Sequence, residues 1–309
     1  MSENPFSLLD FLGYFFPGAT VLIALYHYVP AVNDMLAIKE DTSAIVYVIC
    51  IIAAYVIGHV VALISSITIE KYAVWKYGYP SRYLLRVYSR RRYFHDEPMN
   101  NPAIGENEKK KYLRRKVAIK IFVLVLIAPV SILDFVLSWF GLDYYFTRRL
   151  SGQQVSMIRA KCINLYKKLN IFFQKKSVFQ DDFHRIIHNY YYEKANGHSR
   201  RMENCIAVYD FLRAMSFVFD VLFFIVLIKG IISIDRANLM NWSFYIACYA
   251  ILSYVCFMGF MKFYRKFTVE NFMCLICDEE LNIKNVEMGH DNPTTGNQIK
   301  QENGDITAN

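Results

Sequence analysis

Residues 42 to 69 contain no Asp, Glu, Lys or Arg, an uncharged run of 28 residues. A helix needs about 20 mostly apolar residues to span a bilayer, and water-soluble cores almost never contain an uncharged run this long. The run therefore predicts a membrane-spanning helix. The candidate functions are therefore those of membrane proteins: transport across a bilayer, sensing at the membrane, or anchoring to it.

Five apolar segments occur along the 309 residues, 55% of which are hydrophobic. They lie at about residues 8–32, 44–69, 117–139, 215–232 and 242–261. The N-terminus lacks the basic region of a secretory signal, so we expect the first segment to be retained. The fold class expected from this pattern is an all-α, multi-pass helical membrane protein.

The charges of the connecting loops indicate which segments cross. Thirteen Lys and Arg residues lie in 71–116 and another thirteen in 148–213, on the two sides of the third apolar segment. Loops rich in Lys and Arg stay cytoplasmic, so a crossing third segment would place one of them on the wrong side. Pro129 lies within that segment and breaks or kinks a helix. We therefore expect four spanning helices plus one re-entrant or interfacial hairpin, with both termini cytoplasmic.

Six regions follow from these assignments. They are two transmembrane helices in 1–69, a basic cytosolic connection in 70–116, the re-entrant or interfacial segment in 117–146, a cytosolic helical region in 147–213, the last two transmembrane helices in 214–266, and a C-terminal helix with a disordered acidic tail in 267–309. A helix that begins near Ser199 is expected to run directly into the fourth span and to join the cytosolic region rigidly to the membrane.

Small residues recur every four positions in the second span, as Ala54, Gly58, Ala62 and Ser66. Such a ridge lets helix backbones approach closely in lipid, either within one subunit or between subunits. His59 lies beside the ridge. Because a titratable residue in a bilayer is costly, it is either a gate or proton sensor, or a neutral side chain hydrogen-bonded to its surroundings.

Two carboxylates are further candidates for a pore or gate. Asp220 lies early in the fourth span, and Asp134 lies in the third apolar segment. Repeated around a symmetric oligomer, Asp220 would form a carboxylate ring that favours cations. The alternative is an internal ion pair of Asp220 with Arg213 or His59, and Asp134 carries the same ambiguity.

A polar cluster in the cytosolic region supplies candidates for ligand sensing: His184, Arg185, His188, Arg200 and Arg201. His184 and His188 are four residues apart and share one helix face. A solvated face, a pocket for a phosphate or nucleotide, and a metal site with Asp181 all remain open. The pair Cys274 and Cys277 has no second pair at zinc spacing, so we expect no metal and no cofactor.

No catalytic motif requires an enzyme. Arg90 and His95 have the R-x4-H spacing of HEPN ribonucleases, but an Arg run produces that spacing easily. The strong basic charge outside the C-terminal tail is expected to contact anionic lipids. We expect no direct binding to DNA.

Two segments carry a family resemblance: VIGHVVALISSITIEKYAVWKYGYPSRYLL at 56–85 and FHRIIHNYYYEKANGHSRRMENCIAVYDFLRAMSF at 183–217. Both resemble uncharacterised multi-pass bacterial membrane proteins of anti-phage defence loci, nearest the membrane channel effector of the Hailong system. The resemblance implies an oligomeric ion channel of the inner membrane that is held or opened by a nucleotide second messenger. A partner nucleotidyltransferase, the synthase, would make that signal.

Together these features predict an oligomeric inner-membrane channel or pore, possibly a tetramer, that acts as a ligand-gated effector in anti-phage defence. Two alternatives remain open. One is a non-conducting, membrane-anchored scaffold that binds a soluble partner. The other is a membrane-tethered HEPN-like ribonuclease.

Overall fold

The computed structural model describes residues 11–30, 44–87, 93–94, 106–142, 144–171, 178–179, 183–194, 199–232 and 239–281. Within these ranges the regular secondary structure is all helical, with no strand. Four helical stretches are long and apolar enough to cross a membrane: Phe11–Tyr28, Ala44–Leu84, Arg201–Ile232 and Asn241–Cys277. The expected all-α, multi-pass membrane fold is confirmed.

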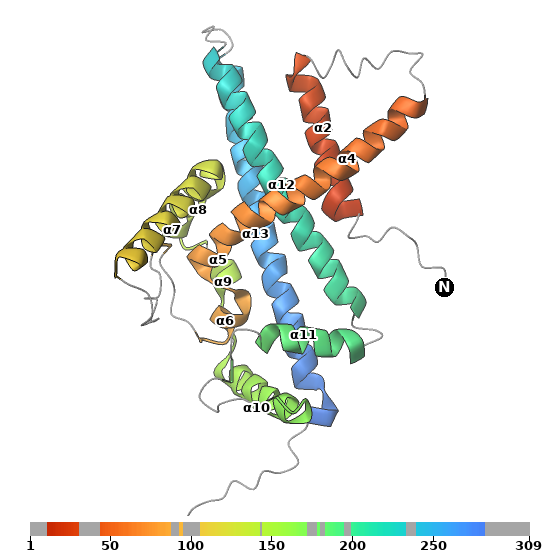
Figure 1. Ribbon diagram of the computed structural model, residues 1–309, viewed down its shortest axis with the longest axis vertical. Coiled ribbons are helices and arrows are strands. Elements are labelled where there is room, and N and C mark those ends of the chain that lie inside the picture. Colours follow the sequence, from red (N-terminus) through yellow and green to blue (C-terminus); the bar gives the residue numbers. More distant parts are fainter. Residues whose placement is uncertain are drawn as a thin grey trace, which may run out of the picture.

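The first two spans cross each other closely. The π-helix η1 (Phe11–Phe15) and α2 (Phe16–Tyr28) lie against α4 (Ala44–Ser65), and α4 passes diagonally across α2 and α12 (Figure 1). Pro17 lies in the first turn of α2, directly after the π-helix η1. Its missing N–H removes one backbone donor from this continuous helix. The helix α4 then continues through η2 (Ser66–Glu70) into α5 (Lys71–Tyr77).

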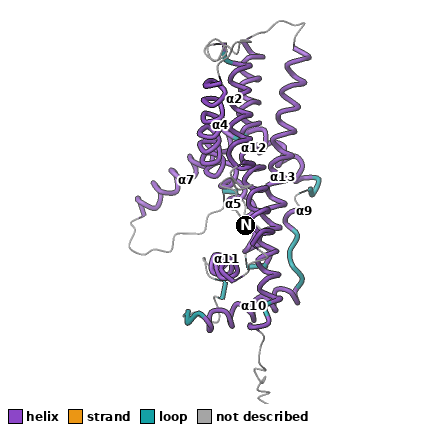
Figure 2. Tube along the Cα trace, turned by 90° about the vertical axis from the view of Figure 1, so that its right-hand side faces the viewer, coloured by secondary structure: helices purple, strands orange, loops and turns teal. Residues whose placement is uncertain are grey.

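The last two spans form the long axis of the molecule. The helix α12 (Ser199–Ile232) has 34 residues and α13 (Leu239–Cys277) has 39, which at 1.5 Å per residue makes them about 50 and 60 Å long. Because the hydrocarbon core is about 30 Å thick, both helices project beyond it. The projecting ends are the charged ones, 199–213 and 262–277, and they lie side by side because the helices are antiparallel (Figures 1 and 2).

The helix α12 is the continuous helix from near Ser199 that the sequence predicted. The boundary expected at residue 266 instead falls inside α13, which runs without a break to Cys277. No helix end is marked at residue 266: the segment from Lys262 to Cys277 contains no Gly or Pro. The expected disordered tail, after residue 281, lies outside the described residues.

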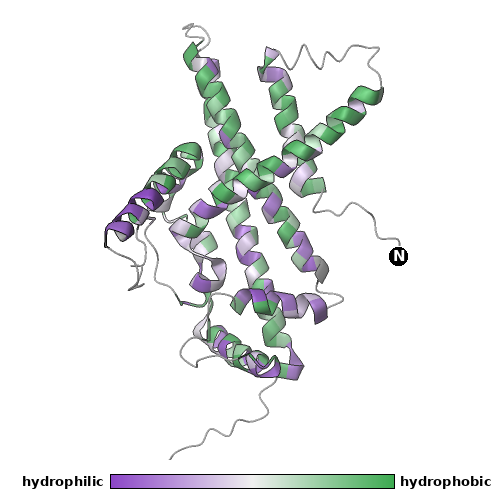
Figure 3. Ribbon diagram, viewed as in Figure 1, coloured by the Kyte–Doolittle hydropathy of each residue, from purple (hydrophilic) through white to green (hydrophobic). Residues whose placement is uncertain are grey.

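The third apolar segment forms a right-angled elbow. The helices α7 (Glu106–Leu126) and α8 (Ala128–Trp139) are bent by 92° at Ile127, and Pro129 lies in the first turn of α8. The basic start of α7 projects from the body, while its second half and α8 are apolar (Figures 2 and 3). The sequence predicted a bent segment here, and its failure to cross the bilayer stays a prediction.

The extramembrane region consists of the projecting ends of α12 and α13 together with short helices. These are α6 (Pro80–Leu84), α9 (Tyr144–Thr147), α10 (Gly152–Lys168), α11 (Phe183–Lys194) and the 3-10 turn η4 (Glu279–Leu281). Ser151 and Gln154 form a reciprocal capping box that fixes the start of α10. The molecule has two apolar cores, one between the spans around Val218 and Phe257 and one in this region around Ile158 and Phe272.

Candidate functional site

The centre of the α12–α13 pair holds a buried polar cluster of Ser216, Asp220 and Ser253, all with 0% exposure. The Ser216 hydroxyl donates to the Ser253 carbonyl at 3.0 Å. The Ser253 hydroxyl lies 2.8 Å from the Ser216 carbonyl and 2.8 Å from Oδ1 of Asp220. The other carboxylate oxygen, Oδ2, is buried and has no hydrogen-bond partner among the described residues.

Helix geometry explains why these residues meet. Ser216 and Asp220 are four residues apart and therefore share the face of α12 that packs on α13. Phe257, which is also buried, lies one turn from Ser253 on the same face of α13, and Val218 and Leu222 belong to the same apolar core. Asp220 lies three to four residues from the middle of the apolar segment 215–232, which is about 5 Å along the helix. The carboxyl group is thus inside the membrane-spanning part of the pair.

The two interpretations offered for Asp220 both need revision in the described chain. Its carboxylate faces α13, so a ring of carboxylates around an oligomer axis requires α12 and α13 to rotate or separate. Arg213 does not pair with it, because its guanidinium binds Glu70 and Asp210. The ion pair with Glu70 instead joins α12 to the end of η2, and the pair with Asp210 lies within α12.

Asp134 has a different environment. Its carboxylate is fully buried and accepts hydrogen bonds from Tyr72 at 2.7 Å and from Tyr77 at 2.7 Å, and Lys76 forms an ion pair with it at 2.6 Å. All three partners lie on α5. Asp134 therefore attaches the elbow helix α8 to the continuation of the second span, in an internal ion pair of the kind that the sequence left open for it, with Lys76 as the partner.

The small-residue ridge packs within one chain over part of its length. Ala54, Gly58 and Ala62 are buried, whereas Ser66 is only half-buried and its neighbour Ser65 is fully buried. A Cβ atom added at Gly58 would overlap the backbone carbonyl of Tyr14. The π-helix that begins at Ser66 changes the helical period there, and this shift explains why Ser66 leaves the ridge.

His59 stacks on Tyr14 with 4.0 Å between ring centroids and meets Tyr55 edge-on at 4.6 Å. The residue as a whole is exposed on the surface of α4. It is not near Asp220 in any described contact. Its predicted role as a gate is therefore not tied to the α12–α13 cluster.

The two histidines expected to sense a ligand pack on α13. The His184 ring lies edge-on to Phe267 and Phe272, each at 5.8 Å, and burial lowers its pKa to about 4. His188 Nδ1 lies 3.2 Å from the Asn271 side-chain oxygen. Arg185 is exposed on the opposite side of α11. The histidine face of α11 is thus an interface between helices.

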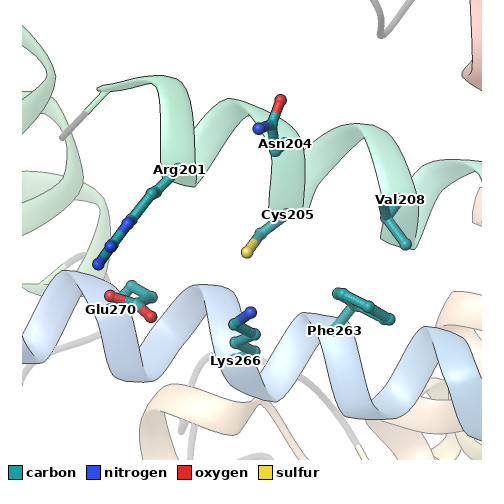
Figure 4. Close-up of a pocket in the computed structure, with 7 residues that line it drawn as sticks. All are labelled: Arg201, Asn204, Cys205, Val208, Phe263, Lys266 and Glu270. Carbon is teal, nitrogen blue, oxygen red and sulfur yellow. The ribbon is translucent and has the colours of Figure 1, made fainter. Parts of the chain in front are cut away.

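A cavity of about 470 Å³ opens between the projecting ends of α12 and α13. Figure 4 shows its lining: Arg201, Asn204, Cys205 and Val208 from α12, and Phe263, Lys266 and Glu270 from α13. Arg201 and Glu270 lie at one end of the lining, Val208 and Phe263 lie at the other, and Lys266 lies between them (Figure 4). An anion with an apolar or aromatic portion fits this arrangement, because Arg201 and Lys266 supply charge and Phe263 supplies a ring face.

Of the sequence-predicted sensing residues, the cavity contains Arg201 alone. Arg200 lies on the same turn of α12, but its side chain is outside the described part. Asp181, Arg90 and His95 also lie outside it. Among the described residues no cluster of three His, Cys, Asp or Glu side chains is placed to hold a metal ion.

Several site residues were missed by sequence reasoning. The spacing of Ser216 and Asp220 on one helix face was visible in the sequence and would have identified that pair. Ser253, Lys266 and Glu270 carry no local signal, because their partners lie 33 or more residues away in the chain. Comparisons with protein-family models, curated proteins and solved structures found no match to the chain.

Proposed function

We propose that the protein is a homo-oligomeric, ligand-gated ion channel of the bacterial inner membrane that acts as an effector in anti-phage defence. One observation carries this proposal: the same two unbroken helices, α12 and α13, contain both the buried carboxyl group of Asp220 and the charged cavity around Arg201 and Lys266. Ionisable groups inside a membrane mark functional sites by default.

The proposed mechanism is a lever. Arg201 and Asp220 are 19 residues apart on one helix, a distance of about 28 Å. A ligand that draws α12 and α13 together at the cavity, or separates them, changes their spacing at Ser253 as well. The ligand gates the channel only if it binds one of the two states more tightly than the other.

The ligand in this proposal is an anion, since Arg201 and Lys266 outnumber Glu270 in the cavity. A nucleotide second messenger made by a partner synthase, the signal implied by the family resemblance, has the required negative charge and a ring that would stack on Phe263. The pore would lie between copies of the chain, possibly four. Anionic lipids would contact the basic start of α7, and both termini would be cytoplasmic.

Ion flux from liposomes tests the proposal. The full chain is reconstituted in vesicles containing anionic lipid, and potassium efflux is recorded with and without a panel of nucleotides. We expect flux that a nucleotide switches on or off. Arg201→Glu and Lys266→Glu should remove the nucleotide response, whereas Lys262→Glu, an exposed cation one turn away on α13, should retain it. A purified oligomer that never conducts under any of these conditions would refute the channel.

A non-conducting scaffold is the second candidate, and one observation favours it. The carboxylates Asp134 and Asp220 are both covered by their own chain, so neither faces a neighbouring copy or a pore. The scaffold predicts that Asp220→Asn and His59→Gln leave function intact. Charge reversal at Arg200 and Arg201 would then abolish binding of the soluble partner, which a pull-down with the partner synthase would reveal.

A further inference from the structure

The contacts between Ser216, Asp220 and Ser253 need more hydrogens than two hydroxyl groups carry. Three short oxygen–oxygen contacts join the helices at this point: Ser216 Oγ to the Ser253 carbonyl at 3.0 Å, Ser253 Oγ to the Ser216 carbonyl at 2.8 Å, and Ser253 Oγ to Asp220 Oδ1 at 2.8 Å. Carbonyl oxygens accept only, and each serine supplies one hydrogen. Two hydrogens therefore serve the two carbonyl contacts, and the third contact has none left.

An ionised carboxylate does not resolve this shortage. If Ser253 turned its hydrogen toward Asp220, its hydroxyl oxygen would face the Ser216 carbonyl at 2.8 Å with no hydrogen between two acceptors. A protonated Asp220 satisfies all three contacts at once, because its own hydroxyl donates to Ser253 Oγ. The Oδ2 atom, which has no partner among the described residues, then belongs to a neutral acid and not to a bare anion.

Within the described part of the chain, no charged group is seen to pair with Asp220. Among the described residues, the Asp, Glu, Lys, Arg and His side chains on the helices packed around it are Arg201, Glu203, Asp210, Arg213 and Lys229 on α12, Lys262, Arg265, Lys266 and Glu270 on α13, His59 on α4, Glu70 on η2, His27 on α2 and Asp134 on α8. None of them forms a described ion pair or hydrogen bond with Asp220. An unpaired charge buried among apolar side chains is strongly unfavourable, so the neutral form is favoured.

We propose that Ser216, Asp220 and Ser253 form a proton-binding site inside the membrane, and that the bound proton holds α12 and α13 together. Loss of the proton would leave a carboxylate that needs water or a monovalent cation at the helix interface, which forces the two helices apart. The proposal that Asp220 is protonated does not depend on the proposed channel function. A role of this proton in gating does rest on the proposed channel function.

Infrared difference spectroscopy tests the site directly. The full chain is studied in lipid nanodiscs at neutral pH, and the carbonyl stretch of a protonated carboxylic acid is compared between wild type and Asp220→Asn. We expect a band that shifts in D2O, is absent from Asp220→Asn, and changes frequency in Ser253→Ala, which removes the acceptor. The band should disappear as the pH is raised and the helices part.

Asp134→Asn is the matched control, because the Asp134 carboxylate is held in an ion pair with Lys76, so its replacement should leave the acid band unchanged. Wild-type and Asp220→Asn spectra that coincide in this region would overturn the proposal. Since the measurement involves no ion flux, a channel that fails to conduct and a site that carries no proton give distinguishable results.

Discussion

The two buried carboxylates of this membrane protein have opposite environments. Asp134 on α8 receives hydrogen bonds from Tyr72 and Tyr77 and an ion pair from Lys76. Asp220 on α12 has a single side-chain contact, with Ser253, and one oxygen without a described partner. Both side chains are fully buried, so the difference lies in their partners and not in their exposure.

This difference indicates that Asp134 holds two helices together, whereas Asp220 can change how its helices pack. A charge whose partners are all present stabilises one arrangement, and removing it leaves the partners unpaired. A carboxyl group with one hydroxyl partner is stable only while it is neutral, so a change in its charge alters the preferred packing. The elbow at Asp134 should therefore behave as a fixed joint, and the α12–α13 contact at Asp220 as the part that responds.

The largest effect is expected at the fixed joint. Asp134→Ala should lower the free energy of unfolding by about 3–5 kcal/mol, because it leaves Lys76 and two tyrosine hydroxyls without their acceptor. Denaturation in mild detergent, together with protease cleavage in the elbow, measures this loss. Ser138→Ala removes only the longer contacts to Lys76 and Tyr77 and should cost about 1 kcal/mol or less. Equal losses for the two variants would contradict the assignment.

A substitution that changes packing but no charge allows comparison with the loss of stability expected for Asp134→Ala. Gly58→Ala should destabilise the protein by about 1–3 kcal/mol, because the new methyl group overlaps the Tyr14 carbonyl and must push η1 away from α4. Gly230→Ala is the matched control in another span: its Cβ would meet Trp242 at an ordinary 3.5 Å. That control should be neutral or slightly stabilising. Thermal unfolding of the two variants compares them.

Acid sensitivity should come from a residue outside both carboxylate sites. Burial lowers the pKa of His184 from 6.5 to about 4, so the unfolded chain takes up a proton at a higher pH than the folded one. The free energy of unfolding should be unaffected by His184 above pH 6.5. It should fall as the pH drops toward 4, and the loss should be about 1–2 kcal/mol at pH 5. His184→Phe should flatten this dependence in pH-dependent unfolding measurements.

Glu280, just beyond the end of α13, should affect stability in a separate and lower pH range. Hydrogen bonds from Lys168 and Lys194 lower the pKa of Glu280 from 4.5 to about 2. Its contribution is present above pH 4.5 and is lost as the pH falls toward 2. A stability loss between pH 6.5 and 5 that persists unchanged in His184→Phe would therefore show that another group is responsible.

The smallest effect is expected at the responsive site. Asp220→Asn should change the free energy of unfolding by less than about 1 kcal/mol, because the amide can donate to Ser253 as a protonated acid does. Asp134→Asn should cost about 1.5–3 kcal/mol, since it removes a charged acceptor. Parallel unfolding curves of these two variants are the sharpest test of the comparison. A reversed order would mean that Asp220 is ionised and stabilising.

Much of the fold was predictable because lipid imposes a simple rule. Spanning segments need long apolar runs, and the runs around Gly58, Val218 and Phe257 all form helices that could cross a membrane. The cytosolic region 147–213 was likewise predicted to be helical, and α10 and α11 lie within it. The division at residue 266 differed from the structure, because nothing local distinguishes a helix that ends at a membrane surface from one that continues beyond it.

The sites were less predictable, since each depends on a partner distant in the sequence. Asp220 was recognisable as a costly residue in an apolar segment, but the Ser253 hydroxyl that contacts it comes from another helix. Asp134 was ambiguous until α5 was placed beside α8. Arg201 was chosen as part of the polar cluster between residues 184 and 201, whereas the cavity pairs it with Lys266 and Glu270 on α13.

The sequence by itself determined that this chain is a helical, multi-pass membrane protein, because the number of consecutive uncharged residues decides whether a segment is stable in lipid. It also determined which residues are costly there. Only the tertiary structure decided what those residues do, because the consequence of a buried charge depends on its partners. Tyrosines and a lysine surround Asp134 and make it a joint, while Asp220 meets one serine and retains an oxygen without a described partner.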